Sequence, residues 1–372
     1  MRYLTRFLPA LAALAAVQLS GCGGAPSSAA DATPNYQTVA MDMDSSDAQS
    51  QPLDLQSCHP HLFQRTRDVV RMINHHLFKV MGRVDAIIDS HPLASGNVHT
   101  WERVYAGLDI QATLTKNADG SYTFVVEAKP QGAADSAFVQ IANASYVAAS
   151  DGTPHAGTGS ITFDLSALAS VVPGEKSRGQ VIVHFAVSGA TKTVQVQLQN
   201  FTPDNSSDVI PPKNANYVFQ RTSGVGGSLK FEENLVLFCP ANPQHLAATL
   251  DTVTRWANVN GQIVGRSDSL ATGGQIAAGD QWLGLTCFSY AAGHPDLGTE
   301  GYWQMKSEDS SGTVLQGDAT MRARANASAS PSCNAVFGAV PSFDTNQNDY
   351  DFASVNFEDA SVVPYPGEPS GS

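Results

Sequence analysis

The residues with the most reactive side chains lie close together at one place, where Cys58, His59 and His61 occur in the sequence SCHPH. Thiolate and imidazole groups at this spacing can bind zinc, but a structural zinc site needs four ligands and usually draws them from two clusters. The chain has neither a second cluster of matching spacing nor a CxxC motif. We therefore expect no metal and no cofactor at this position.

A second candidate lies near the C-terminus. Asp344, Asn346 and Asn348 have the spacing of the first three ligands of an EF-hand loop, but Asp349 replaces its turn glycine and Val355 its last glutamate. We interpret the stretch as acidic surface. The motifs GxSxG, HExxH and SxxK do not occur in the sequence. We therefore predict no catalytic residue, and an envelope hydrolase whose site is assembled from scattered residues remains an alternative.

Exposed-looking aromatic residues offer one candidate ligand groove, formed by Trp282, Tyr302 and Trp303. Large aromatic side chains also dominate ordinary protein cores. Both interpretations stay open from the sequence.

The chain has five cysteines, and four of them suit disulfides. An even number of cysteines in an exported protein indicates a disulfide framework, here with three possible pairings. Cys58 precedes a helical pattern and Cys239 ends the apolar strand NLVLFC, so a bridge between them would join helix and sheet. We predict the pairs Cys58–Cys239 and Cys287–Cys333.

The fifth cysteine, Cys22, follows a basic start and a short apolar run over 7–17, which is the layout of a secretory signal and too short to span a membrane. The residues Leu19-Ser20-Gly21-Cys22 resemble the lipobox of bacterial lipoproteins. The resemblance implies that Cys22 becomes the first mature residue and carries fatty-acyl chains such as palmitate.

The lipobox resemblance predicts an exported protein that is anchored in a membrane through its lipid. Gly23 occupies the position where an aspartate retains members of this family in the inner membrane, so we expect the outer membrane in a cell with two. The SCHPH stretch is similar to uncharacterised exported lipoproteins whose folded part begins with Cys-His-Pro-His.

The charge balance restricts the partners. The formal net charge is −13, and no basic stripe interrupts it. This disfavours nucleic acid and anionic lipid headgroups as partners.

Composition divides the chain into five parts. We predict a signal peptide at 1–21, a disordered Ala/Ser/Asp/Pro tether at 22–57, a helix plus β half at 58–205, a second β half at 206–343, and an acidic, Pro-rich tail at 344–372.

One long amphipathic helix opens the folded part, from about Pro60 to Ser90. Its apolar residues recur at helical spacing and form one stripe. We expect His76, which lies in this stripe, to be a packed histidine rather than a ligand or a base. The stripe consists of Leu62, Val69, Ile73, His76, Leu77, Val80, Val84, Ile87 and Ile88.

The rest of the folded part shows strand alternation with short turns. Hairpins are predicted over 110–129, 180–201 and 252–268, the last turning at Asn260-Gly261 so that Trp256 falls opposite Gly265. Short helices are expected at 164–172 and 242–250. We predict a mainly β antiparallel meander, as a curved sheet, half-barrel or sandwich, with the helix packed on it.

The face of the last hairpin opposite Trp256 carries Arg255, Arg266 and Asp268, so we expect that face to be wet. Three functions are compatible with these features. The first is a non-enzymatic, lipid-anchored envelope protein that binds another protein or a surface polymer. The others are a carrier with an apolar ligand in its half-barrel, which needs a cavity of several hundred Å³, and the hydrolase.

Overall fold

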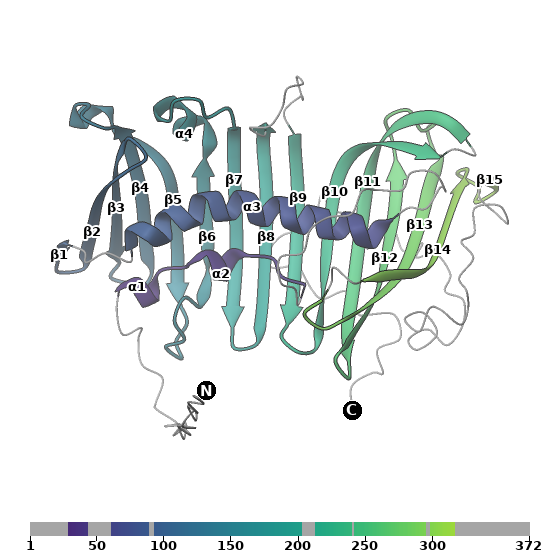
Figure 1. The fold of residues 1–372 in the computed structure, drawn as a ribbon, viewed down its shortest axis with the longest axis horizontal. Helices are drawn as coiled ribbons and strands as arrows, with labels where there is room; N and C mark the ends of the chain where they lie inside the picture. Colours follow the sequence, from purple (N-terminus) through teal and green to yellow (C-terminus); the bar gives the residue numbers. More distant parts are fainter. Residues whose placement is uncertain are drawn as a thin grey trace, which may run out of the picture.

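The computed structural model describes residues 29–43, 61–88, 93–202, 213–239, 242–294 and 298–316. Over these residues fifteen strands form one antiparallel sheet, and each strand pairs with its neighbours in sequence order (Figure 1). The first and last strands do not pair with each other, so the sheet is open. The predicted mainly β antiparallel meander is confirmed, and it is one sheet rather than a sandwich of two.

The elements have the following bounds. The helices are α1 Ala29–Ala32, α2 Tyr36–Val39, α3 Leu62–Ile88 and α4 Leu165–Val171, with a 3-10 turn at Asp135–Ala137. The strands are β1 Leu93–Ser95, β2 Val98–Tyr105, β3 Leu108–Lys116, β4 Tyr122–Pro130, β5 Val139–Ala148, β6 Gly157–Asp164, β7 Arg178–Ser188, β8 Thr191–Thr202, β9 Lys213–Thr222, β10 Gly226–Cys239, β11 Asn242–Val259, β12 Gln262–Thr272, β13 Gln281–Ala291, β14 Thr299–Glu308 and β15 Val314–Gln316.

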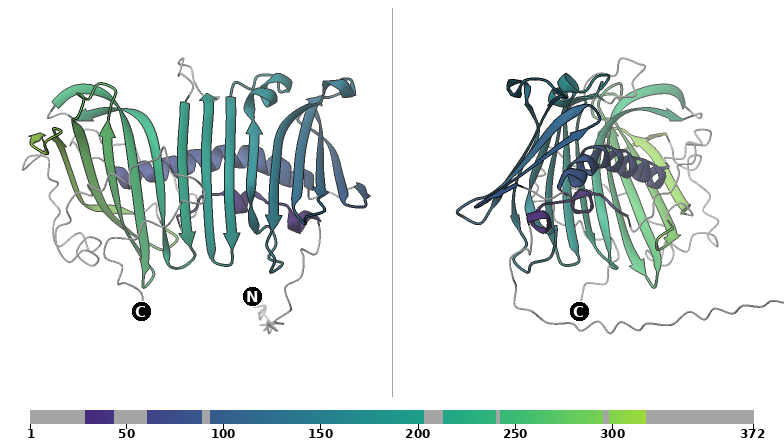
Figure 2. Two further views of the ribbon diagram at one scale, coloured as in Figure 1. Left: turned by 180° about the vertical axis from the view of Figure 1, so that it is seen from behind. Right: turned by 60° about the vertical axis from the view of Figure 1, so that its left-hand side comes forward.

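The helix α3 lies along the concave face of the curved sheet and crosses its strands (Figures 1 and 2). Its N-terminal turns meet the far end of the chain, where the ring of Phe63 stacks on Phe288 with centroids 4.1 Å apart. The hydroxyl of Thr66 lies 2.7 Å from that of Thr254 on β11. Further along α3, Ile73 is 3 % exposed within the same core cluster. The side chain of His76 lies outside the described part of the chain.

Burial divides the sheet into two regions. Along β3 and β4 almost every second side chain is buried, facing α3, while the others are partly exposed. Along β12 and β13 nearly every side chain is buried on both faces. Alternate residues of a strand point to opposite faces. The outer face is therefore accessible over β3 and β4 and covered over β12 and β13.

Residues 29–43 correct the prediction of a disordered tether over 22–57. They form α1, α2 and an extended segment beside α3 (Figure 1). Val39, Met41 and Met43 are at most 2 % exposed. The Asn74 side chain on α3 bonds to both the N–H and the carbonyl of Met41. Composition suggested disorder because Ala, Ser and Asp dominate, but three closely spaced apolar side chains suffice to bury this segment.

The two short helices expected from the sequence can be compared with the structure. The helix expected at 164–172 is observed as α4, whose first turn is capped by Asp164 through a bond from the Ala167 N–H. The prediction of a helix at 242–250 is wrong, because that segment belongs to β11 and pairs with β10. Strand pairing over a long hairpin outweighs the local capping signal of Asn242-Pro243.

The three predicted hairpins are confirmed as β3–β4, β7–β8 and β11–β12, and so is the register predicted for the last of them. Val259 pairs with Gln262 across Asn260-Gly261, and both turn residues have positive φ, as a type I′ turn requires. The boundary predicted at 205/206 lies outside the described residues, and the strands on either side of it, β8 and β9, are hydrogen-bonded neighbours. The signal peptide at 1–21 and the tail at 344–372 also lie outside them.

Candidate binding surface

The outer face of β3 to β9 carries two rows of uncharged, mostly polar side chains in register across adjacent strands. In one row, consecutive strand partners contribute Thr115, Thr123, Ser145, Ser160, His184 and Gln195. In the next row, two residues along each strand, they contribute Thr113, Val125, Asn143, Thr162, Ile182, Gln197 and Asn216. We call these two sets the outer rows.

The geometry of the sheet sets the spacing of the outer rows. Neighbouring strands lie about 4.8 Å apart, so successive side chains of a row repeat at that interval. The two rows are separated by about 6.6 Å, the advance of two residues along a strand. The members from β3 to β7 are partly or fully exposed, whereas Gln195 on β8 is 1 % exposed. The accessible part of the surface therefore begins at β3 and narrows toward β8.

The outer rows have no charged group at neutral pH. Burial lowers the pKa of His184, their one titratable member, below its ordinary value, so its imidazole is neutral at pH 7. The remaining polar members carry hydroxyl or amide groups, which both donate and accept hydrogen bonds. On the β8–β9 side the Gln195 amide donates to the Asn216 side-chain oxygen at 2.9 Å. This neutrality contrasts with the net charge of −13 of the whole chain.

The charged side chains nearest the outer rows are Glu127 on β4 and Asp164 on β6, each two residues further along its strand than a row member. Lys129 lies beyond Glu127 on the same face and is compensated. Lys129 pairs in register with Asp109 between β3 and β4, with Nζ 3.7 Å from the carboxylate. The same ammonium donates to Asp135 at 2.7 Å, and hydrogen bonding to Asp135 raises the pKa of Lys129. The outer rows are therefore neutral themselves but border charged groups, of which Lys129 is ion-paired.

The predicted aromatic groove is not formed by its three residues together. Cys287 pairs with Tyr302, and Thr286 with Trp303, so Tyr302 and Trp303 project from opposite faces of β14. Trp282 pairs with Ser307, four residues from Trp303 along the strand. Trp282 and Tyr302 are 8 % and 7 % exposed, which makes them core residues on different faces.

Among the cysteines, only the side chain of Cys287 falls within the described part of the chain. It is fully buried and disulfide-bonded. Cys22, Cys58 and Cys333, and the side chain of Cys239, lie outside the described residues. The predicted pairs Cys58–Cys239 and Cys287–Cys333 therefore remain predictions.

Histidine and acidic residues do not assemble into a metal site within the described ranges, where no group of three or more potential ligands occurs. His61 instead lies with its Nδ1 3.2 Å from Glu300 of β14. His59 and the stretch from Asp344 to Val355 lie outside the described ranges. No helix of the described ranges is long and apolar enough to cross a membrane.

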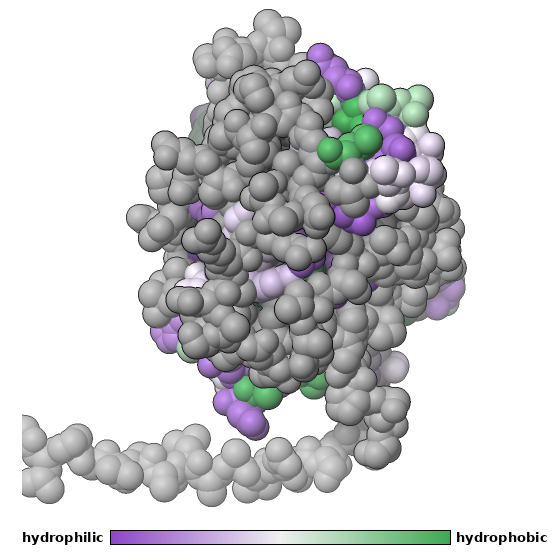
Figure 3. Space-filling model, turned by 90° about the vertical axis from the view of Figure 1, so that its right-hand side faces the viewer, coloured by the Kyte–Doolittle hydropathy of each residue, from purple (hydrophilic) through white to green (hydrophobic). Residues whose placement is uncertain are grey.

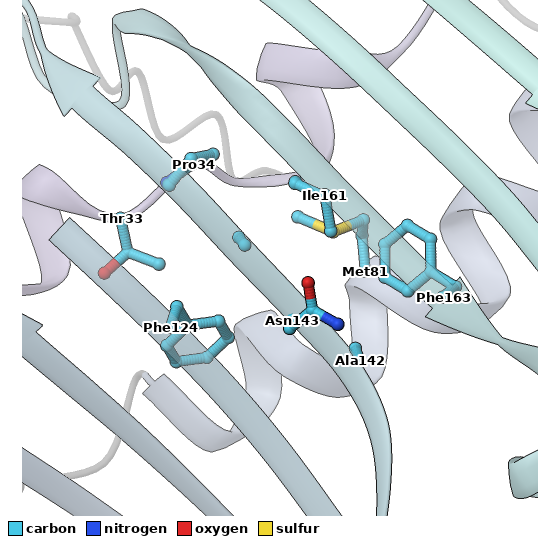
Figure 4. A pocket seen from close by; sticks show the side chains of 9 residues that line it. Thr33, Pro34, Met81, Phe124, Ala142, Asn143, Ile161 and Phe163 are labelled. Atoms are coloured by element: carbon cyan, nitrogen blue, oxygen red, sulfur yellow. The ribbon is translucent and has the colours of Figure 1, made fainter.

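A small apolar cavity lies between residues 29–43, α3 and the concave face of the sheet (Figure 4). The centre of a water molecule could occupy about 10 Å³ inside this cavity, so the cavity has room for about one water. A carrier of a lipid-sized ligand would need several hundred Å³. The lining residues are Thr33, Pro34, Met81, Phe124, Ala142, Asn143, Ala144, Ile161 and Phe163.

The expectation of a wet face on the last hairpin is wrong. Arg255, Arg266 and Asp268 are 1 %, 5 % and 0 % exposed. Arg266 forms two hydrogen bonds to Asp268, at 2.7 and 2.6 Å, and Arg255 Nη1 lies 3.6 Å from the same carboxylate. Strand alternation assigned these residues correctly to the face away from Trp256, but alternation does not reveal what covers a face.

The outer rows were not predicted as a surface, although the alternation of Thr, Gln, Asn and Ser in the predicted strands was the available signal. Their alignment depends on the register of seven strands, only some of which are joined by recognisable turns. The chain matches no protein-family model, no curated protein and no solved structure.

Proposed function

We propose that this protein is a lipid-anchored cell-envelope protein that binds a neutral, hydroxyl-rich surface polymer, such as a polysaccharide, through the outer rows. The observation that carries the proposal is the neutrality and regular spacing of these rows on a chain of net charge −13. Hydroxyl and amide side chains match the donors and acceptors of a sugar chain. Rows that run across the strands suit an extended polymer with a short repeat.

Anchorage rests on the lipobox resemblance at Cys22. Ala29, where α1 begins, is the seventh residue after Cys22. A fully extended chain advances at most about 3.6 Å per residue, so this linker reaches about 25 Å. The folded body would then stay close to the membrane surface, within reach of an envelope polymer.

The concave face supports binding outside the sheet rather than carriage inside it. The buried stripe of α3, including Ile73 and Leu77, occupies the space that a carrier would need for its ligand. Residues 29–43 close the same side, with Met41 held to α3 by Asn74. The outer rows are the broad accessible surface that remains over β3 to β7.

Anchorage is tested by expression of the full chain and mass spectrometry of its mature N-terminus. We expect an acylated Cys22 as the first residue and partition of the protein into detergent. Cys22→Ser should abolish both. A mature N-terminus at any other residue would contradict the anchor and leave the binding surface to be judged separately.

Binding is tested by sedimentation of purified protein with insoluble neutral polysaccharides, such as cellulose and chitin, and with an anionic polygalacturonate gel. We expect retention on a neutral polymer and a loss of at least about tenfold in affinity for Ser145→Arg, since burying an unpaired charge in a neutral contact is costly. Ser170→Arg, on the exposed side of α4, is the matched control and should bind as the unaltered protein does. Equal binding by both variants, or retention on the anionic gel alone, would refute the proposed surface.

A further inference from the structure

The outer face of β11 to β13 is buried although the described element packed across these strands, α3, lies on the other face. Thr254 contacts α3 through Thr66, and Phe288 contacts it through Phe63. Because side chains alternate, Val253 and Cys287 point away from α3. Both are 0 % exposed.

The residues around them form an apolar patch with a charged neighbour. Val253, Leu270 and Leu283 form a separate cluster and are at most 4 % exposed. Leu285 is fully buried on the same face. Next to it lies the ion-paired group of Arg255, Arg266 and Asp268. We call these residues, together with Cys287, the covered face.

Charges that are removed from water must be compensated and enclosed, and apolar side chains at such low exposure must have packing partners. Figure 3 shows this end of the molecule, where described residues of both hydrophilic and hydrophobic character reach the surface at the upper right. The covered face therefore requires a covering layer.

We propose that the C-terminal segment following β15 packs on the covered face and is joined to it by a disulfide between Cys333 and Cys287. Three facts identify this occupant. The sheet ends at Gln316 of β15, two strands from β13, and 56 residues follow in the sequence. Cys287, at one end of the covered face beside Arg266, is disulfide-bonded.

The third fact is the composition of the segment. Directly after Cys333 the sequence is NAVFGAVPSF, which supplies Val336, Phe337, Val340 and Phe343 for contact with the apolar patch. Beyond it lies the acidic stretch of 344–359, which complements a group with two arginines and one aspartate. Each of these two features has a counterpart on the covered face, namely the apolar patch around Leu283 and the arginines beside Cys287.

Cys58 is the less suitable partner for Cys287. It lies three residues before His61, which is bonded to Glu300 on the concave side with α3. The thiol of Cys287 points to the opposite face of the sheet. A Cys58 bridge would have to pass around or through the sheet, whereas a segment continuing from β15 starts beside the covered face.

The decisive experiment is peptide mapping of the intact, unreduced protein by mass spectrometry. We expect a peptide pair that links Cys287 to Cys333. A link from Cys287 to Cys22, Cys58 or Cys239, or a free thiol at Cys287, would overturn the proposal. This experiment needs no variant and does not depend on the proposed polymer binding.

Two variants test the packing of the segment. Phe337→Asp should lower the midpoint of thermal unfolding by at least about 5 °C, as expected for loss of one buried aromatic contact in a domain of this size, and should increase the fluorescence of a hydrophobic dye. Tyr365→Asp, an aromatic-to-acid change nearer the C-terminus, is the matched control and should change neither. Equal behaviour of the two variants would overturn the packing at Phe337, and a Phe337→Asp protein that does not fold at all while the control does would support it.

Discussion

Glu300 caps the first turn of α3 from a strand more than 230 residues away in the sequence: its Oε1 accepts a hydrogen bond from the backbone N–H of Phe63 at 3.1 Å. The Gln64 N–H reaches the same oxygen at 3.4 Å, and His61 contacts the other oxygen. The first backbone N–H groups of a helix have no partner within it, and the helix dipole favours a negative charge there. Glu300 thus holds the start of α3 on β14.

Replacement of Glu300 by Ala should lower the free energy of unfolding by about 1.5–3 kcal/mol, since a partly buried carboxylate that accepts several hydrogen bonds is removed. Glu102→Ala is the matched control, because Glu102 is exposed and its carboxylate accepts a hydrogen bond from the Gln111 amide at 3.0 Å. The control should cost less than about 0.5 kcal/mol in urea denaturation. Similar losses for both variants would show that Glu300 does not anchor the helix.

Trp256 lies between two glycines, and only one of these neighbours followed from the sequence. It pairs with Gly265 on β12, as predicted, and with Gly227 on β10. A methyl group at Gly227 would meet the indole Cζ2 at 2.6 Å. At Gly265 it would instead meet the Phe288 ring at 2.1 Å. The indole therefore covers Gly227, and the phenyl ring of Phe288 covers Gly265.

Gly227→Ala should destabilise the protein by about 1–3 kcal/mol, because the added methyl would meet both the Gln220 carbonyl oxygen, at 2.3 Å, and the indole. A double-mutant cycle with Trp256→Phe checks the cause. The smaller ring should relieve part of the clash, so the double variant should lose less free energy than the sum of the two single losses. Strictly additive losses would mean that the methyl clashes with something other than the indole.

The two glycines that pair with Trp256 illustrate what local sequence patterns can reveal. The pairing with Gly265 follows from one hairpin whose Asn260-Gly261 turn fixes the register. The pairing with Gly227 joins β10 to β11, and no tight turn signal marks the connection. Sequence alternation also assigned Arg255 to the face away from Trp256. It could not show that this face is buried, since burial depends on segments distant in the sequence.

The folded structure of residues 29–43 shows the same limit of prediction from local sequence, here near the N-terminus. Arg221 on β9 pairs with Asp42, and the Tyr290 hydroxyl donates to the Met43 carbonyl at 2.7 Å. These partners come from strands about 180 to 250 residues later in the chain, so no local window contains them. The candidate surface was hidden for a related reason, because its rows exist only when β3 to β9 are aligned.

The contact of α3 with the concave face can be measured with two apolar residues of the same helix. Leu77 is 1 % exposed, and Met72 is 38 % exposed. Leu77→Ala should lower the free energy of unfolding by about 2–5 kcal/mol, through lost transfer energy and the cavity left behind. Met72→Ala should cost less than about 0.5 kcal/mol. Equal shifts of the urea midpoint would contradict the observed orientation of the helix.

Lys192 provides a pH test of the contact between residues 29–43 and the sheet. Its ammonium donates to the carbonyls of Gln37 and Ala40, at 2.6 and 2.9 Å. Asp42 lies 3.7 Å away but is paired with Arg221. Burial lowers the pKa of Lys192 from its ordinary 10.5 to about 8. The folded protein therefore releases this proton before the unfolded chain does.

Between about pH 8 and 10.5 the unfolded state holds more protons at Lys192 than the folded state, so this group makes the protein more stable as the pH rises. Below about pH 8 the ammonium is charged in both states and the full cost of its burial opposes folding. We expect the free energy of unfolding of the unaltered protein, relative to Lys192→Met, to increase between about pH 7 and pH 9.5 in urea denaturation. The comparison should stop there, because burial raises the pKa of Tyr146 and Tyr217, whose ionisation would favour unfolding at higher pH. A difference between the two proteins that stays constant or shrinks over this range would show that Lys192 is not desolvated by residues 29–43.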